Sequence, residues 1–522
     1  MLTLLFLTLF QKGQDPSQEP GWWKEAVFYE VFVRSFYDSD GDGIGDFRGL
    51  IQKLDYLNDG DPNTDSDLGV DALWLMPIMD SPSYHGYDMT DAFNTNPQYG
   101  SLADYQALMT AAHQHGIAIV IDLMLNHISS QHPWFTEAAA NPDSPYRNWF
   151  LWSKTDPGYY GPWGEPVWHE KNGQYFYGIF WSGMPDLNYN NPEVTQKMYE
   201  VSRFWLKEMG ADGFRLDAVR HLIEAGEEQA GSPATHAWLK EYQAFIKSVD
   251  ANGLTLGEIW DDTDEVVPYV KSGELDLAFE FALAESMLKA VMTGDPLGFK
   301  DQVDRILQVY PAGTFATFLT NHDQNRVMSQ LRGDIVKAKS AASLLLTLPG
   351  TPFIYYGEEL GMKGVKPDED IRTPMQWSAA DHAGFSSGKP WRDPKPDYSK
   401  VNWLAQKDDP DSLWNHYRRL IQVRKAHPAL RTGTLNWLKT DQPKVVAFER
   451  KLGEERIWVV CSLIPQPQTV QLSGTGPVGS HPVQSLLDPE SRSELSVNPD
   501  GEWHYELNLV PGTPQILKIS QK

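Results

Sequence analysis

The chain has 522 residues and carries 44 Lys and Arg against 70 Asp and Glu, a formal net charge of −26. This charge repels phosphate backbones and anionic lipid surfaces, so it argues against nucleic acids and anionic membranes as partners. Hydrophobic residues make up 41% of the chain, which is enough for a sizeable core, and neutral substrates and metal cations stay open as ligands. The 19 Trp and 22 Tyr offer flat amphipathic faces that suit sugar rings, although core packing accounts for most such residues.

The N-terminus bears on location. Residues 2–10 form an apolar run that is too short to cross a bilayer, and a polar stretch follows up to Pro20. This pattern favours a secretory leader over residues 1–20, although it lacks a basic start and a clear cleavage site. We therefore expect a secreted or periplasmic protein, with a cytoplasmic location if the run is not a signal. We expect no stable membrane span elsewhere, and the single cysteine, Cys461, excludes an internal disulfide.

Short runs rich in β-branched and aromatic residues alternate with amphipathic helical patterns from residue 22 to about residue 352. The predicted strands cover residues 27–32, 72–77, 118–123, 213–216, 254–258, 275–281, 314–319 and 352–356. The helical patterns between them include residues 102–115, 194–209, 235–249, 299–309 and 335–346. Eight such strands predict an α/β fold, a closed (β/α)8 TIM barrel. The alternative, a doubly wound open sheet, would require a Gly-rich phosphate turn after the first strand, and none is present.

Two segments depart from the barrel pattern. About ninety residues separate the third strand from the fourth, where a βα unit needs roughly thirty. The stretch 128–191 is rich in Trp, Tyr, Pro and Gly and predicts an inserted subdomain (domain B). After a helix at 412–427, short strands at 445–450, 457–463, 469–472, 503–507 and 515–519 predict an antiparallel β-sandwich. The predicted catalytic barrel thus spans 21–127 and 192–430, and the sandwich (domain C) spans 431–522.

Polar side chains follow the predicted barrel strands, at the end where such barrels place their active sites. The third strand runs into Asp122–His127, the fourth ends in Arg215-Leu-Asp217, the fifth ends in Glu258, and Asn321-His322-Asp323 follows the seventh. Arg215 and Asp217 are two residues apart and so face the same side, where the guanidinium is expected to lower the pKa of Asp217. Glu258 follows an apolar run, and burial there would favour its protonated form. An ionised carboxylate, a protonated acid and histidine donors suit cleavage of a glycosidic bond, and the alternative is a structural ion-pair network.

At these motifs the chain resembles the α-amylase family of glycoside hydrolases, from about Trp22 to its end. The resemblance rests on residues 122–127, 213–221, 257–260, 318–323 and 350–359. It implies a retaining mechanism with Asp217 as nucleophile, Glu258 as acid/base and Asp323 as transition-state stabiliser. The positions that the resemblance assigns to substrate binding are Tyr87, Asp88, His127, Arg215, His221, His322 and Arg372.

Details of the motifs place the chain within the family. Residues 184–188 (Met-Pro-Asp-Leu-Asn) resemble the group intermediate between oligo-1,6-glucosidases and neopullulanases, and residues 372–377 recur in the former. Exo-acting relatives carry an Asp where this chain has Tyr84, and α-1,6-specific relatives carry a Val where it has Ala218. The pair Arg220-His221 is close to the Lys-His pair that amylases use beside their reducing-side subsites. The resemblance therefore implies an endo-acting α-amylase that cleaves α-1,4 bonds of starch and maltooligosaccharides, expected to be a monomer.

The loop after the first strand suggests a metal. Residues 38–46 place carboxylates at the first, third, fifth and ninth positions and a glycine at the sixth, which resembles the start of a calcium loop. The twelfth position is Gly49, so the bidentate carboxylate of a helix–loop–helix site is absent. Related enzymes hold Ca²⁺ in this loop, which implies the ligands Asp38, Asp40, Asp42, Ile44 (through its carbonyl) and Asp46. The alternative is a solvated Asp-rich turn.

Three other functions stay open. The first is an exo-acting α-glucosidase or oligo-1,6-glucosidase, and the second is a glucosyl-transferring enzyme of the trehalose synthase type. The third is a non-catalytic amylase-like binding or transporter subunit. Such subunits usually lose members of the catalytic trio, and this chain retains all three.

Overall fold

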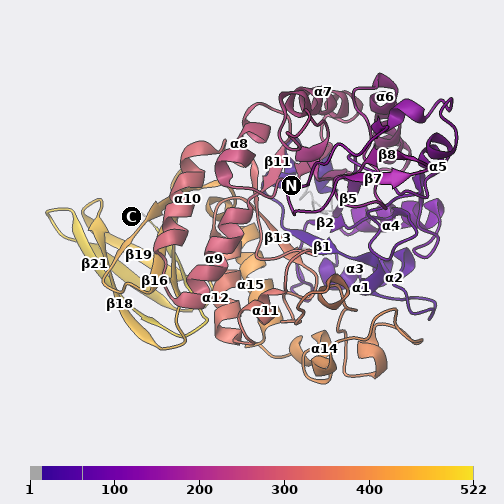
Figure 1. The fold of residues 1–522 in the computed structure, drawn as a ribbon. Helices are drawn as coiled ribbons and strands as arrows, with labels where there is room; N and C mark the ends of the chain where they lie inside the picture. Colours follow the sequence, from indigo (N-terminus) through magenta and orange to yellow (C-terminus); the bar gives the residue numbers. More distant parts are fainter. Residues whose placement is uncertain (1–14, 62, 489, 521–522) are drawn as a thin grey trace, which may run out of the picture.

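A computed structural model describes residues 15–61, 63–488 and 490–520 (Figure 1). The apolar run at 2–10 lies outside the described residues, so the leader stays a prediction. None of the helices in the described part has the length and apolarity that a bilayer span requires.

Eight parallel strands close into a barrel, as the sequence predicts. They are β1 (Phe28–Val31), β2 (Ala72–Leu75), β5 (Ala118–Met124), β9 (Gly213–Asp217), β10 (Leu254–Gly257), β11 (Leu277–Phe279), β12 (Phe315–Thr317) and β13 (Thr351–Tyr355). Every residue of these strands is buried, because side chains fill the inside of the barrel and helices cover its outside. Because the strands are buried, polar side chains of the barrel can reach solvent only at the ends of the strands.

Helices surround the barrel. The longer ones are α4 (Leu102–Gln114), α6 (Pro192–Arg203), α7 (Pro233–Val249), α8 (Thr263–Lys271), α9 (Phe281–Thr293), α10 (Leu297–Val309), α12 (Ile335–Thr347) and α15 (Leu413–Ala426). The helix predicted over 194–209 ends in a π-helical turn, Phe204–Glu208. Shorter helices occupy the loops: α1 (Val33–Phe36), α2 (Phe47–Ile51), α3 (Leu54–Leu57), α5 (Pro133–Ala140), α11 (Val327–Gln330), α13 (Asp368–Ile371), α14 (Trp403–Gln406) and α16 (Pro428–Thr432).

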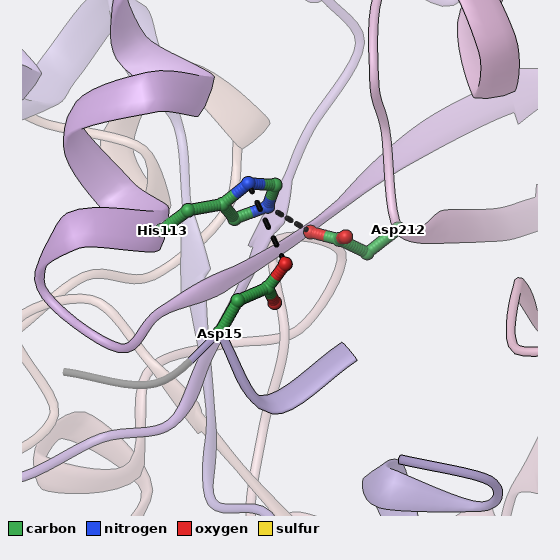
Figure 2. Close-up of side chains that lie close together, drawn as sticks. All are labelled: Asp15, His113 and Asp212. Carbon is green, nitrogen blue, oxygen red and sulfur yellow. Dashed lines mark hydrogen bonds and ion pairs between the residues drawn. The ribbon is translucent and has the colours of Figure 1, made fainter. Parts of the chain in front are cut away.

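The first described residues cover the N-terminal end of the barrel. Trp22 stacks on Phe28 of β1 with the ring centroids 5.6 Å apart. His113 of α4 lies between two carboxylates, with Nε2 2.9 Å from Asp212 and Nδ1 3.7 Å from Asp15 (Figure 2). Burial lowers the pKa of His113, but Asp212 and Asp15 outweigh it and raise the pKa. Residues 15–20, inside the predicted leader, are therefore attached to the barrel.

The segment between β5 and β9 contains a small sheet of its own. Its strands are β6 (Trp152–Ser153), β8 (Gln174–Tyr177) and β7 (Trp168–Lys171), and they fall inside the predicted insertion. A two-stranded sheet that the sequence did not indicate, β3 (Met79–Asp80) with β4 (Asp91–Thr95), lies between β2 and α4.

The C-terminal part forms one antiparallel sheet of nine strands, yellow in Figure 1. They are β14 (Thr434–Trp437), β15 (Lys439–Thr440), β16 (Val445–Leu452), β17 (Glu455–Ser462), β18 (Gln468–Thr475), β19 (Gly479–Ser485), β20 (Arg492–Val497), β21 (Glu502–Leu509) and β22 (Gln515–Ile519). One set of its apolar residues forms a core of its own, in which Trp458 of β17 stacks on Trp503 of β21 at 4.6 Å, while Phe448, Val459 and Ile516 belong to the core of the barrel. The predicted strands are all present, and the sheet folds over itself as a sandwich does.

Candidate active site

Arg215 lies at the centre of the polar residues at the carboxyl ends of the strands. Its Nη1 donates to Asp122 at 2.9 Å and to Asp217 at 2.6 Å, and its Nη2 lies 2.9 Å from Glu258. The guanidinium is fully buried, so these charged contacts are shielded from water. One guanidinium group therefore holds carboxylates from β5, β9 and the end of β10 together.

Burial dominates the ionisation of the two central carboxyl groups. It raises the pKa of Glu258 to about 7, against the opposing effect of Arg215. It also raises the pKa of Asp217 to about 6, although Arg215 acts to lower it. The expectation that Arg215 gives Asp217 a lowered pKa is therefore wrong in its net direction, because the loss of hydration is the larger effect.

The residue after Asp217 has an unusual backbone conformation. Ala218 adopts φ 50° and ψ 34°, in the left-handed region that non-glycine residues seldom occupy. Its N–H donates to Glu258 Oε2 at 3.2 Å. The expected apolar surroundings of Glu258 thus contain two donors, the Ala218 amide and Arg215, that fix the orientation of the carboxyl group.

A second group of charges surrounds His322. Its Nδ1 lies 2.6 Å from Glu30 of β1, and its Nε2 lies 3.1 Å from Asp323 and 2.6 Å from the hydroxyl of Tyr87. Burial lowers the pKa of His322, but Asp323 and Glu30 outweigh it and raise the pKa to about 10. Burial acts to raise the pKa of Asp323, but His322 and Arg372 outweigh it, so the net pKa is lowered and the carboxylate stays ionised. His322 is therefore a cation that donates to both carboxylates.

Tyr87 joins the two groups. Its ring lies nearly parallel to that of His322, with the centroids 5.4 Å apart, and its hydroxyl donates to Asp122 at 3.0 Å. Trp74 of β2 also donates to Asp122, at 3.3 Å. Neither Glu30 nor Trp74 is singled out by the sequence, and Asp122 is marked there only as the start of a polar strand end. Glu30 could have been found, because it is a lone carboxylate near the end of an apolar strand.

The other predicted substrate-binding residues fall in different places. Arg372 contacts Asp323 at 2.7 Å, and the ring of His221 lines the cleft beside Glu258. The Nε2 of His127 lies 3.1 Å from the backbone carbonyl of Tyr87, so His127 supports the tyrosine. Asp88 accepts hydrogen bonds from Ser81 and Ser83 in its own loop, and within the described residues it contacts none of Asp217, Glu258 and Asp323.

A cavity of about 350 Å³ opens beside Glu258 and His221, and aromatic side chains from two segments form its walls. Trp163 and Trp260 are 59% and 50% exposed, which is unusual for residues of this size. Each stacks on a phenylalanine, Trp163 on Phe180 at 5.3 Å and Trp260 on Phe281 at 4.6 Å. Exposed and fixed aromatic faces of this kind suit sugar rings.

A second aromatic pair lies near Asp323, outside the lining of this cavity. The guanidinium of Arg372 is 5.9 Å from the ring of Tyr84, and Tyr84 stacks on Trp391 at 5.2 Å. Trp391 is held in turn by its amide, which donates to the carbonyl of Gly43 at 2.9 Å. The loop that contains the predicted calcium ligands therefore supports this pair.

The carboxylates of Asp38, Asp40 and Asp42 converge, with one oxygen of each within 4.8 Å of the others. Burial raises the pKa of Asp42, and the neighbouring carboxylates raise it further. Asp46 lies outside this convergent group, and its carboxylate accepts from Ser39 and from the Gly49 amide at the start of α2. Hard oxygen donors that repel one another suit a divalent cation such as Ca²⁺.

Comparison with known proteins identifies the family. The model of the alpha amylase catalytic domain matches residues 30–433. The chain belongs to the alpha-amylase family of glycoside hydrolases. Family members similar to it include alpha-amylase 3 of Dictyoglomus thermophilum, 39% identical, with 88% of each chain covered. An oligo-1,6-glucosidase of Parageobacillus thermoglucosidasius is 33% identical, with 84% of this chain and 90% of the relative covered. The crystal structure of an alpha-amylase from H. orenii superposes with a TM-score of 0.84 at 40% identity, over 95% of this chain and all of the other.

Proposed function

We propose that this protein is an endo-acting α-amylase that hydrolyses α-1,4 bonds of starch and maltooligosaccharides with retention of configuration. The observation that carries the retaining mechanism is the single guanidinium of Arg215, which contacts both Asp217 and Glu258. A shared guanidinium keeps the two carboxyl groups close, whereas an inverting enzyme needs a wider gap to admit a water molecule.

The reaction then proceeds by two displacements. Asp217 attacks the anomeric carbon while Glu258 donates its proton to the departing glycosidic oxygen, so a glycosyl-enzyme ester forms as the sugar bond breaks. Glu258, now ionised, takes a proton from water, whose oxygen attacks the same carbon and releases Asp217. Asp323, which the cation His322 keeps ionised, stabilises the positive charge that develops on the sugar.

The pKa values predict a narrow pH optimum. We expect kcat/KM to fall as the pH drops below about 6, because Asp217 then takes up a proton. We expect kcat/KM to fall again as the pH rises above about 7, because Glu258 then loses the proton that it must donate. The Glu258→Gln variant, assayed on a glycosyl fluoride whose leaving group needs no proton, should lose the alkaline limb and keep the acidic one. An unchanged alkaline limb in that variant would assign the upper pKa to another group.

The aromatic pairs near Glu258 and near Asp323 support internal cleavage. Because Glu258 protonates the leaving group, the cavity with Trp163 and Trp260 is the acceptor side, and Tyr84 with Trp391 lies on the donor side. Tyr84 offers a ring where a carboxylate would grip the end of a chain. A glucan can therefore extend past the cleavage point in both directions.

The cleavage pattern is tested with p-nitrophenyl maltoheptaoside whose non-reducing end is blocked. We expect the blocked and free substrates to be cleaved at rates within about threefold, and starch to lose its iodine colour early with mixed products. Maltose and isomaltose should be poor substrates. Cleavage of the free heptaoside alone, with glucose as the first product, would show an exo-acting α-glucosidase, and trehalose formed from maltose would show a transferring enzyme.

We further propose that Asp38, Asp40, Asp42 and the carbonyl of Ile44 hold Ca²⁺, with Asp46 ordering the loop. The ion would neutralise the clustered carboxylates and brace the loop that contacts Trp391. We also propose that the protein is exported, because residues 2–10 form the kind of apolar run that a secretory leader contains.

Chelation should lower the melting temperature by several degrees, because a ligand bound only by the folded state stabilises it by about 2.7 kcal/mol at a hundred times its Kd. Calorimetry in EDTA and in excess Ca²⁺ measures the difference. The Asp40→Asn variant should abolish it, while Asn at the exposed Asp143 should leave it intact. Equal melting temperatures in both buffers, after prolonged dialysis against chelator, would refute the site.

A further inference from the structure

Two arginines are fully buried where the barrel meets the C-terminal sheet, the side on which Figure 1 shows α9, α10 and α12. Arg424 of α15 donates to the carbonyls of Leu346, Leu348 and Gly350, at 3.1, 3.0 and 2.6 Å. Arg450 of β16 donates to the carbonyls of Thr347 and Gly433, at 2.5 and 2.9 Å. Both groups thus cap the C-terminal end of α12, where the helix dipole favours positive charge.

These two arginines lack a carboxylate in direct contact among the residues that the structure describes, although Asp71 acts on Arg424 from a distance. Neither takes part in an ion pair within the described part of the chain, and the Nε–H of each is buried with no acceptor. Burial, together with the nearby Arg431, lowers the pKa of Arg424 to about 9. The Nε–H of Arg431 is likewise without an acceptor, although its Nη1 pairs with Glu25. A buried charge without a counter-ion is costly, so this junction attracts anions within a strongly acidic protein.

A cavity of about 630 Å³ lies directly beside these charges. Gly350 and Gly433, whose carbonyls accept from the two buried arginines, form part of its wall, and Lys24 and Arg431 also line it. Lys24 is exposed and has no ion-pair partner among the residues the structure describes. The remaining wall is mostly apolar, with Ile306, Leu307, Pro349, Phe315 and Leu435.

The cavity is remote from the active site. Lys24 precedes β1, Phe315 begins β12 and Gly350 precedes β13, so the cavity lies at the N-terminal ends of the strands. The catalytic carboxylates lie at the opposite ends. Its aromatic residues Tyr310 and Phe315 are only 8% and 4% exposed, so it lacks the open ring faces that sugars stack on.

We propose that this cavity binds a small anionic amphiphile, with its carboxylate or sulfonate between Lys24 and Arg431 and its apolar body against Leu307 and Leu435. The cations select the charge, while the volume and apolar wall favour a hydrocarbon or aryl body over a bare inorganic anion. Binding here is independent of the proposed amylase activity, because none of the lining residues belongs to the active site.

The probe is 8-anilinonaphthalene-1-sulfonate, and its uncharged analogue N-phenyl-1-naphthylamine provides the matched control. Fluorescence titration should show one saturable site for the sulfonate on the folded wild-type protein and at least tenfold weaker binding of the neutral analogue. The Lys24→Met and Arg431→Met variants should each weaken sulfonate binding several-fold, and the double variant more than tenfold. Lys271→Met, which removes an exposed charge far along the chain from the cavity residues, should leave binding unchanged.

A steric variant tests the site independently if the charge variants lose stability. Ala312 lines the cavity and is exposed, so Ala312→Trp should fill the cavity mouth and abolish binding without a change in charge or in starch hydrolysis. Displacement of the probe by maltoheptaose would place it in the active-site cleft and overturn the proposal. So would affinity unchanged by Ala312→Trp, or inorganic sulfate that competes as tightly as the aryl sulfonate.

Discussion

Asn at position 217 should reduce starch hydrolysis by at least about 10⁴-fold, and Gln at position 258 by about a thousandfold. Asp217 is the group that we propose attacks the sugar, and an amide cannot form the ester. Glu258→Gln retains the contact surface but has no proton to donate. Because fluoride leaves without a proton, the loss of activity of this variant should be much smaller on a glycosyl fluoride than on starch. The measurement is kcat/KM on starch and on the fluoride for both variants.

Matched controls separate this result from a general effect of removing negative charge. Asp301 and Glu241 are exposed on α10 and α7, and Asp301→Asn and Glu241→Gln should stay within about twofold of the parent. Melting curves should show all four variants folded. Activity of Glu258→Gln within about tenfold of the parent on starch would refute the assignment, as would a trapped glycosyl-enzyme on a residue other than Asp217.

Arg215→Lys should lower kcat/KM on starch by about a hundredfold, although the charge is conserved. A guanidinium presents several donors in a fixed plane, and here it contacts Asp122, Asp217 and Glu258 together. The compact ammonium of lysine cannot reach all three, so at least one buried carboxylate loses its partner. Its pKa then rises, and the pH optimum should narrow or shift as the rate falls.

The matched control is Arg305→Lys, which alters an Arg–Asp ion pair that is about half exposed. Exposed pairs contribute little, so this variant should keep its activity and its melting temperature. If Arg215→Lys lost much of its melting temperature as well as its activity, Arg215 would act mainly in folding. A rate within about threefold of the parent would show that the shared guanidinium is not needed for catalysis.

Much of the fold and of the site follows from the sequence, because strand periodicity is a local property. The alternation of buried strands and amphipathic helices predicts the closed barrel, and the rule that polar residues end such strands selects Asp217, Glu258 and Asp323. The side-chain spacing of two also places Arg215 beside Asp217, at the observed 2.6 Å. The family follows from the same motifs, since they are long and specific.

The tertiary structure alone decides what burial and distant neighbours do to these groups. The sequence shows Arg215 beside Asp217 and so predicts a lowered pKa, but only the packed barrel shows that lost hydration outweighs the cation. Glu30 and His322 lie far apart in the chain and meet at 2.6 Å because β1 and the loop after β12 belong to one barrel. Arg424 and Arg450, which form no ion pair in the described part of the chain, lie with the cavity beside them where the barrel packs on the C-terminal sheet, and no local pattern records such a junction.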